Sequence, residues 1–177
     1  MLPKRAFVLG GARSGKSSFA ERLVENYGKP KVYIATAQAF DDEMRDRISG
    51  HKIARADGWR LVEAPMNAAE TLGQVGAGEV ALLDCATMWL TNQLLAETDL
   101  EQAVADLANA IRNCHGEVVI VSNEVGLSIV PENALARRFR DEQGALNFNL
   151  AALSDLSVLV AAGLPLVLKG SLPDGMT

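Results

Sequence analysis

The sequence predicts a doubly wound α/β domain, in which helices cover both faces of a mostly parallel sheet. Short apolar runs recur along the chain, and stretches of helical periodicity lie between them. The run 118–121 is apolar at every position, which is typical of a parallel strand buried on both faces. We expect strands at 6–9, 31–36, 60–62, 79–84, 117–122, 156–161 and 166–168.

Three segments have the spacing of amphipathic helices. Residues 17–27 carry Phe19, Leu23 and Tyr27 four residues apart, and this helix is expected to stop at Gly28. We also expect helices at 99–114 and at 132–154, with Gly144 as a potential break in the second. The length of 177 residues suits one domain, so residues 1–177 are predicted to form a single unit. Residues 164–177 would supply a closing strand and a loose tail.

The composition excludes several kinds of protein. A net charge of −5 argues against a basic surface for DNA or RNA, so no nucleic-acid partner is expected. Cys85 and Cys114 have no metal-binding spacing and fit a reducing compartment, which favours the cytoplasm. No apolar run approaches the roughly 18 residues of a membrane span.

The clearest motif follows the first predicted strand. Residues 10–17 read GGARSGKS, which matches G-x-x-x-x-G-K-[ST] between a strand and an amphipathic helix. Glycines let the backbone N–H groups curl around phosphate oxygens at the positive end of a helix. Lys16 would contact the β- and γ-phosphates, and Ser17 would offer its hydroxyl to Mg²⁺. The motif predicts a nucleoside triphosphate site made by Gly10, Gly11, Ala12, Arg13, Ser14, Gly15, Lys16 and Ser17.

A carboxylate is predicted beside this loop. The apolar strand 79–84 ends in Asp84, and an acid in this position commonly reaches the Mg²⁺ of a phosphate loop. The alternative is that Asp84 caps the following segment. The guanine-reading pattern N-K-x-D is missing, and a formal D-x-x-G match at 141–144 lies within a predicted helix, so we interpret that match as coincidence.

A histidine lies on a basic helical face farther along the chain. Arg47, His51 and Arg55 are four residues apart, and Lys52 lies beside them. Neighbouring cations oppose protonation of the imidazole and would also neutralise a triphosphate. His51 is therefore a candidate nucleophile toward phosphorus; the alternative is an ordinary solvated helix with an incidental histidine.

From about residue 6 to residue 169, the chain resembles the bifunctional adenosylcobinamide kinase/adenosylcobinamide-phosphate guanylyltransferase family of adenosylcobalamin biosynthesis. The resemblance rests on GGARSGKS at 10–17 and on several shorter blocks. These are YIATA at 33–37, DEM at 42–44, RISGH at 47–51, WR at 59–60, Glu63, LDC at 83–85, TN at 91–92, SNEVG at 122–126 and IVPEN at 129–133. The last two blocks are distinctive, because no general phosphate-loop kinase requires them.

The resemblance implies two reactions. ATP or GTP phosphorylates the hydroxyl of the aminopropanol arm of adenosylcobinamide, and GTP then gives GMP to a histidine with loss of pyrophosphate. The substrate phosphate collects the GMP as adenosylcobinamide-GDP. The guanylylated histidine falls on His51, while some relatives have a second histidine where this chain has Gly50.

The resemblance also implies further site residues, a RecA-type phosphate-loop fold and a homotrimer. Nucleotide contacts carry over to the phosphate loop and to Ala35, Thr36, Ala37, Lys52, Ile53, Ala54, Arg55, Glu63 and Asp84. An acid near GTP could accept the two N–H groups of the guanine edge, and either Glu63 or Asp84 could do so. Asn123 and Glu124 end a predicted buried strand, where a substrate or phosphate contact competes with a role in forming the turn.

Two other functions remain compatible with the phosphate loop by itself. One is a small-molecule kinase without the guanylyl step. The other is a non-catalytic GTP-binding switch or assembly module, against which His51 and the missing N-K-x-D pattern both argue.

Overall fold

The computed structural model describes residues 1–38 and 58–176 of the chain. Within these ranges, seven strands form one sheet in the order β3-β2-β4-β5-β1-β6-β7. All neighbouring strands are parallel except β6 and β7, which form an antiparallel pair at one edge. The strands are β1 (Arg5–Gly10), β2 (Lys31–Ala35), β3 (Trp59–Glu63), β4 (Val80–Asp84), β5 (Glu117–Asn123), β6 (Leu156–Ala161) and β7 (Leu164–Lys169).

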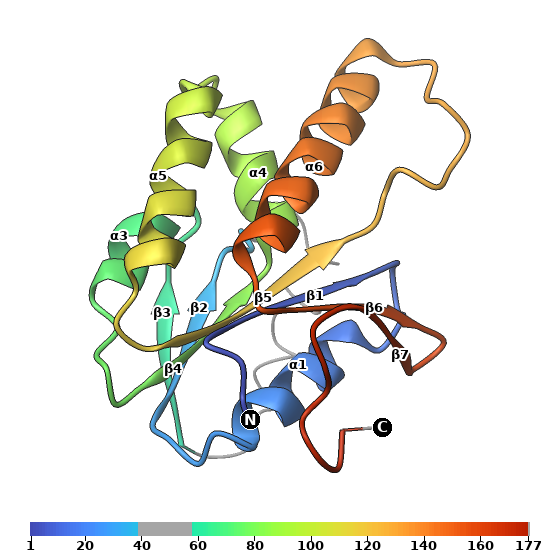
Figure 1. Cartoon of the computed structure of the whole chain (residues 1–177). Helices are drawn as coiled ribbons and strands as arrows, with labels where there is room; N and C mark the ends of the chain where they lie inside the picture. Colours follow the sequence, from blue (N-terminus) through green and yellow to red (C-terminus); the bar gives the residue numbers. More distant parts are fainter. Residues whose placement is uncertain (39–57, 177) are drawn as a thin grey trace.

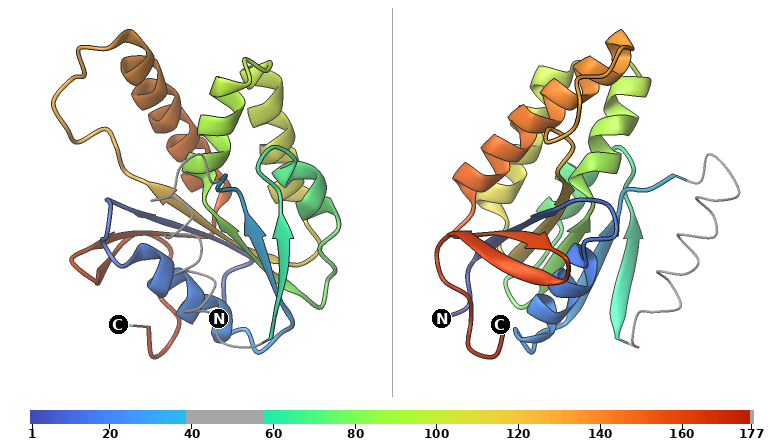
Figure 2. Two further views of the ribbon diagram at one scale, coloured as in Figure 1. Left: turned by 180° about the vertical axis from the view of Figure 1, so that it is seen from behind. Right: turned by 90° about the vertical axis from the view of Figure 1, so that its right-hand side faces the viewer.

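The helices lie on both faces of this sheet (Figure 1). One face carries α1 (Lys16–Glu25), which contacts β1, β4, β5 and β6. The other carries α3 (Ala68–Gly73), α4 (Ala86–Leu95), α5 (Leu100–Asn113) and α6 (Ala134–Leu153). Two further views show α4, α5 and α6 gathered on one side of the sheet (Figure 2). The α/β fold class predicted from the sequence is therefore confirmed.

Two apolar layers hold the sheet between the helices. On the α1 side, Phe19 and Leu23 pack against strand residues such as Val8 and Leu82. On the other side, residues of α3 to α6 pack against the alternate strand positions, such as Ile120. The continuous apolar strands arise because both of their faces are buried, as expected for a parallel sheet.

Several element bounds differ from those expected. The helices α3 and α4 were not predicted from the sequence: α3 has only six residues, and α4 has no clear polar face because seven of its ten residues are buried. Gly144 does not break α6, and a β-carbon at Gly144 would meet no atom within 4 Å. The C-terminal tail is not loose, because Met176 is 4% exposed and lies in the α1-side core.

The carboxyl ends of the parallel strands form one edge where the predicted site residues gather. Chain segments leave β1, β2, β4 and β5 at this edge, and the phosphate loop leaves from β1. In open parallel sheets, ligands bind outside this edge. None of the described helices is long and apolar enough to cross a bilayer.

Candidate active site

The phosphate loop closes tightly at its first glycine. A β-carbon on Gly10 would lie 2.4 Å from the Ser14 Oγ and 2.6 Å from the backbone oxygen of Val160. Only glycine fits between the loop and β6 at this point. A β-carbon on the next residue, Gly11, would meet nothing within 4 Å. Gly10 therefore sets the close approach of the loop to the sheet, and Gly11 does not.

The loop turns into α1 through a left-handed residue. Gly15 caps the helix with φ at 91°, a conformation that glycine adopts without strain. The loop is also braced from outside, since the Gly163 N–H in the β6–β7 turn donates to the Ser14 carbonyl oxygen at 2.8 Å. The start of α1 presents backbone N–H groups and the positive end of the helix dipole, which together favour a bound anion.

Lys16 and Ser17 form the first turn of α1, and both are half-buried. The Lys16 Nζ donates to the backbone oxygen of Gly11 at 3.2 Å, so the side chain folds back over the loop. In this position the ammonium group lies over the loop that would hold the phosphates. This arrangement is the one that the motif predicts for a triphosphate site.

The strand register places three predicted residues in one row at the carboxyl edge. Ala35 on β2 pairs with Glu63 on β3 and with Asp84 on β4. Paired residues of parallel strands point to the same face, and this row shares its face with Leu82, which packs on the α1 side. Asp84 thus projects toward the face from which the phosphate loop and α1 extend. Glu63 lies two strands from Asp84, a separation of about 10 Å.

Asp84 is held by a tyrosine from the neighbouring strand. The Tyr33 hydroxyl donates to the Asp84 Oδ2 at 2.7 Å, and Tyr33 is 3% exposed. This contact joins β2 to β4 just below the carboxyl edge. It was not anticipated from the sequence, because it depends on strand order.

Thr36 fastens the ends of β2 and β4 together. Its hydroxyl accepts from the Cys85 N–H at 2.8 Å and donates to the Cys85 carbonyl oxygen at 2.7 Å. Its own N–H donates to the Asp84 carbonyl oxygen, and its carbonyl accepts from the Asn92 amide. Thr36 is fully buried, so its side chain orders the backbone around Asp84 and Cys85.

Burial also keeps Cys85 neutral. Desolvation and, to a smaller extent, the adjacent Asp84 carboxylate raise the pKa of the Cys85 thiol to about 12, while Lys16 opposes the shift. A thiol in this state is neither a nucleophile nor a metal ligand at neutral pH. Cys85 therefore fills space behind the carboxylate.

A buried polar cluster supports the end of β5. Ser122 bonds to Asn147 and Gln143 on α6, and the Thr87 hydroxyl accepts from the Asn123 N–H at 2.8 Å. Asn147 also donates to the Asn123 carbonyl oxygen. This cluster was not predicted from the sequence; the signal that could have shown it is the set of polar residues on the buried face of α6.

The cluster leads to Glu124 beside the phosphate loop. The Glu124 N–H donates to the Gly10 carbonyl oxygen at 3.1 Å, and its carboxylate accepts from the Gly126 N–H. A cavity of about 410 Å³ adjoins this point. Its lining comes from the phosphate loop, the loop after β5 and the end of β6: Gly11, Ala12, Arg13, Ser14, Glu124, Leu127, Leu159, Val160, Ala161 and Ala162.

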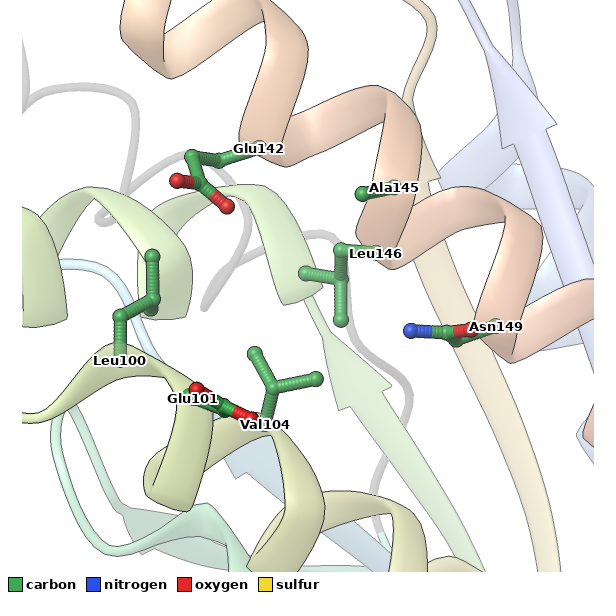
Figure 3. A pocket seen from close by; sticks show the side chains of 7 residues that line it. All are labelled: Leu100, Glu101, Val104, Glu142, Ala145, Leu146 and Asn149. Carbon is green, nitrogen blue, oxygen red and sulfur yellow. The ribbon is translucent and has the colours of Figure 1, made fainter.

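A second cavity, of about 330 Å³, lies between α5 and α6 (Figure 3). Glu101 and Glu142 bring carboxylates to it, and the rest of its lining is mostly apolar. No residue of the phosphate loop or of the Glu63–Asp84 row contributes to it. We assign it no part in nucleotide chemistry.

The phosphate loop, Ala35 to Ala37, Asp84 and Glu63 all lie at the carboxyl edge of the sheet, and β1 and β3 are each two strands from Asp84 on β4. The predicted nucleophile His51 and the predicted contacts Lys52, Ile53, Ala54 and Arg55 lie outside the described residues. Met88 and Trp89 lie on α4, where Trp89 is buried in the core and donates to the Met66 carbonyl oxygen.

Magnesium fits the donors at this edge. Mg²⁺ prefers oxygen ligands and is usually held by one or two carboxylates together with substrate phosphates and water. Asp84 and Ser17 supply a carboxylate and a hydroxyl on the same side of the sheet. The described residues contain no cluster of three or more His, Cys, Asp or Glu side chains that could form an all-protein cage.

A protein-family model described as "Cobinamide kinase / cobinamide phosphate guanyltransferase" matches residues 6–168. The chain belongs to this family. The match spans all of the strands up to β7, the phosphate loop and the carboxyl edge. The resemblance drawn from the sequence motifs is therefore confirmed.

Curated relatives agree with this assignment. The chain is 45% identical over 171 residues to "Bifunctional adenosylcobalamin biosynthesis protein CobP" of Pseudomonas aeruginosa, covering 94% of this chain and 98% of that protein. It is 41% identical to the protein CobU of Escherichia coli and 43% identical to CobU of Salmonella typhimurium, each described by the same phrase. Both matches cover 92% of this chain and 98% of the relative.

Solved structures show the fold at much lower sequence identity. The RadB recombinase matches with a TM-score of 0.52 and 15% identity over 89% of this chain and 74% of that chain. A Pyrococcus horikoshii protein matches with a TM-score of 0.54 and 12% identity over 97% of this chain and 88% of that chain. The likeness to a recombinase agrees with the expected RecA-type phosphate-loop fold.

Proposed function

We propose that this chain catalyses both reactions of its family at the carboxyl edge of the sheet. It phosphorylates adenosylcobinamide from ATP or GTP and then transfers GMP from GTP to the new phosphate. The observation that carries this proposal is the triphosphate cradle of Gly10 to Ser17, which lies on the same side of the sheet as Asp84, in a chain of the cobinamide kinase family. The reactions need adenosylcobinamide and a nucleotide as substrates.

In the kinase step, the hydroxyl oxygen of the substrate arm attacks the γ-phosphorus of the nucleotide, and the hydroxyl proton passes to solvent water. The bond to the bridging oxygen breaks, and the nucleoside diphosphate leaves with the electron pair. The loop N–H groups and the Lys16 ammonium stabilise the charge that develops on the phosphate oxygens. Because these donors are already oriented before the reaction begins, they stabilise the developing charge without a cost of reorganisation.

In the guanylyl step, a ring nitrogen of His51 attacks the α-phosphorus of GTP. Pyrophosphate leaves, and a phosphorus–nitrogen bond holds GMP on the enzyme. An oxygen of the substrate phosphate then attacks the same phosphorus, the phosphorus–nitrogen bond breaks, and adenosylcobinamide-GDP is released. Arg47, Lys52 and Arg55, which are close to His51 in the sequence, would favour its neutral, nucleophilic form and attract the triphosphate.

We assign Mg²⁺ binding to the Ser17 hydroxyl and the Asp84 carboxylate. Bound there, the ion would neutralise charge on the phosphate oxygens. The support is the chemistry of the two donors and their common position on the α1 side of the sheet.

We assign guanine recognition to a carboxylate of the row that holds Glu63 and Asp84. The test measures the affinities of the Glu63→Gln and Asp84→Asn variants for GTP and for ITP, which lacks the guanine amino group. The variant that loses the preference for GTP identifies the carboxylate that reads guanine.

We also propose that the protein forms a homotrimer and lies in the cytoplasm. The trimer comes from the family resemblance alone, and light scattering of the purified protein tests it. The cytoplasm is supported by two cysteines that are both free and buried, as expected in a reducing compartment.

The test uses the two histidines of the chain as a matched pair. Incubation with [α-³²P]GTP should label the wild-type protein with an acid-labile, base-stable bond. The His51→Ala variant should lose the label, and the His115→Ala variant, which changes an exposed residue just after α5, should keep it. Label that survives in His51→Ala refutes the assigned nucleophile.

Product analysis separates the proposal from its alternatives. Wild-type protein with GTP, Mg²⁺ and adenosylcobinamide should yield adenosylcobinamide-GDP and pyrophosphate by mass spectrometry. Phosphorylated substrate without pyrophosphate would instead identify a kinase alone. GTP binding without any turnover would identify a non-catalytic nucleotide binder.

A further inference from the structure

We infer that Tyr33 is a positioning residue that holds the Asp84 carboxylate in its metal-binding orientation. This inference rests on the proposed role of Asp84 as a metal ligand. It assigns a second function to a side chain that otherwise belongs to the α1-side core.

The contact is short and protected from water. The Tyr33 hydroxyl lies 2.7 Å from the Asp84 Oδ2, and Tyr33 is 3% exposed while Asp84 is half-buried. Tyr33 pairs with Leu82 in the ladder between β2 and β4, one side-chain repeat below the Ala35–Asp84 pair. The hydroxyl therefore approaches the carboxylate from below the edge, on the sheet side.

The tyrosine ring is itself fixed in place. The Trp59 ring meets it edge-on, with 5.7 Å between centroids and an interplanar angle of 78°. The Lys31 Nζ lies over the Trp59 ring, 5.1 Å from its centroid. An aromatic pair in this geometry restrains both rings, so the hydroxyl is presented at a defined position.

The backbone of Asp84 is restrained as well. Thr36 donates its N–H to the Asp84 carbonyl oxygen at 3.2 Å and bonds through its hydroxyl to both backbone groups of Cys85. With the main chain and Oδ2 both held, the carboxylate loses the freedom to rotate. Its other oxygen, Oδ1, is left to bind the metal ion.

Such a partner has a known type of effect on metal affinity. Carboxylates that bind metals are commonly oriented by hydrogen bonds from outside the metal's own ligand set, and losing such a bond typically weakens metal binding by about 10- to 100-fold. Tyr33 meets the description, because it contacts the carboxylate and projects from the strand below the edge rather than from the phosphate loop.

The two tyrosines of the chain supply a matched experiment. In Tyr33→Phe the ring stays and only the hydroxyl that binds Asp84 is lost. In Tyr27→Phe the hydroxyl that is lost donates to the Pro3 carbonyl oxygen at 2.7 Å, at the opposite end of the molecule's first strand. Both variants remove one hydroxyl hydrogen bond from the α1-side layer, so general loss of stability affects both.

The measurement is Mn²⁺ binding, followed by electron paramagnetic resonance, in the presence of α,β-methylene-GTP, which cannot transfer GMP. Tyr33→Phe should weaken Mn²⁺ binding about tenfold or more, and Tyr27→Phe should leave it within about twofold of the wild type. Binding of the same analogue in EDTA should be equal in all three proteins, because the nucleotide cradle is untouched.

Asp84→Asn separates failure of this inference from failure of the proposed function. If Asp84→Asn weakens Mn²⁺ binding and Tyr33→Phe does not, Asp84 is a ligand that needs no positioning, and the inference is overturned. If Asp84→Asn has no effect on Mn²⁺ binding, the proposed metal role itself is wrong. Equal losses in Tyr33→Phe and Tyr27→Phe would show a structural effect alone and would also overturn the inference.

Discussion

The backbone N–H of Gly163 donates to the carbonyl oxygen of Ser14 at 2.8 Å. This bond links the β6–β7 turn to the phosphate loop, across about 150 residues of sequence. It makes the shape of the nucleotide site depend on a turn that contributes no phosphate-binding motif of its own.

We predict that Gly163→Ala weakens nucleotide binding. Gly163 has φ at 80°, so alanine there would strain the turn by about 1–2 kcal/mol or shift it away from Ser14. A shift of the brace should weaken GTP binding about three- to tenfold, measured by isothermal titration calorimetry.

The matched control is Gly28→Ala, at the end of α1. Gly28 also has a positive φ, at 61°, and a β-carbon there would meet nothing within 4 Å, as at Gly163. It should lose similar stability and keep its GTP affinity. Equal affinities for GTP in the two variants would show that the brace does not shape the loop.

Gly10→Ala should disrupt the phosphate loop itself. The new β-carbon would overlap the Ser14 Oγ and the Val160 backbone oxygen, and backbone atoms cannot move aside cheaply. We expect a loss of about 1–3 kcal/mol in the free energy of unfolding, measured with urea, together with loss of GTP binding.

Gly11→Ala is the control for this substitution, because the position is open and has no positive φ. Its free energy of unfolding should stay within about 0.5 kcal/mol of the wild type. If the two alanine variants unfold at the same urea concentration, the close approach at Gly10 is not a constraint in solution.

Thr36→Val should destabilise the fold although valine has nearly the same shape. The change leaves the buried N–H and carbonyl groups of Cys85 without the threonine hydroxyl. We expect a loss of about 1–3 kcal/mol in the free energy of unfolding. Thr36→Ser keeps the hydroxyl and should recover most of that loss. Urea denaturation of the wild type and the two variants measures the three free energies of unfolding.

The thiols should be inert in the native protein. Burial raises the pKa of Cys85 to about 12 and also raises the pKa of Cys114, so both remain protonated thiols at pH 8. An aromatic disulfide reagent should titrate no thiol in the native protein and two in urea. A Cys114→Ala variant isolates Cys85, and rapid reaction of that native variant at pH 8 would contradict its burial.

The same shift predicts how stability depends on pH. The Cys85 pKa is about 12 in the folded protein against 9.0 for an ordinary thiol, so between these values the folded state holds the extra proton. Stability from this group is complete below pH 9 and declines as the pH rises from 9 toward 12. Urea denaturation of Cys114→Ala and of Cys85→Ala/Cys114→Ala, compared at pH 8 and pH 10, measures it.

The phosphate loop could be predicted because its chemistry is local. The eight residues of the motif run without a break from the end of a strand into the start of a helix, and the glycine positions follow from the backbone shape that phosphate requires. The inner strands were also predictable, since burial of both faces makes them largely apolar, whereas the edge strands β3 and β7 are mostly exposed. The helix α4 was missed because burial on several sides removes the polar stripe that marks a helix, and α3 was missed because its six residues are too few to show a period.

The surroundings of Asp84 could not be predicted in the same way. The sequence marked Asp84 as a strand-end acid, but its partner Tyr33 lies 51 residues earlier and meets it only because β2 and β4 are neighbours. Thr36 was expected to contact nucleotide, and that contact remains a prediction; the structure adds that its hydroxyl bonds to Cys85.

By itself the sequence determined the family, the α/β class, the phosphate loop and the candidate nucleophile, because each depends on residue types at fixed local spacing. Only the tertiary structure decided which strands lie side by side. That order sets which side chains meet Asp84, which turn braces Ser14, and which polar residues of α6 support the end of β5. Such contacts depend on the distance in space between segments that are far apart in the chain. A local pattern of residue types does not give that distance.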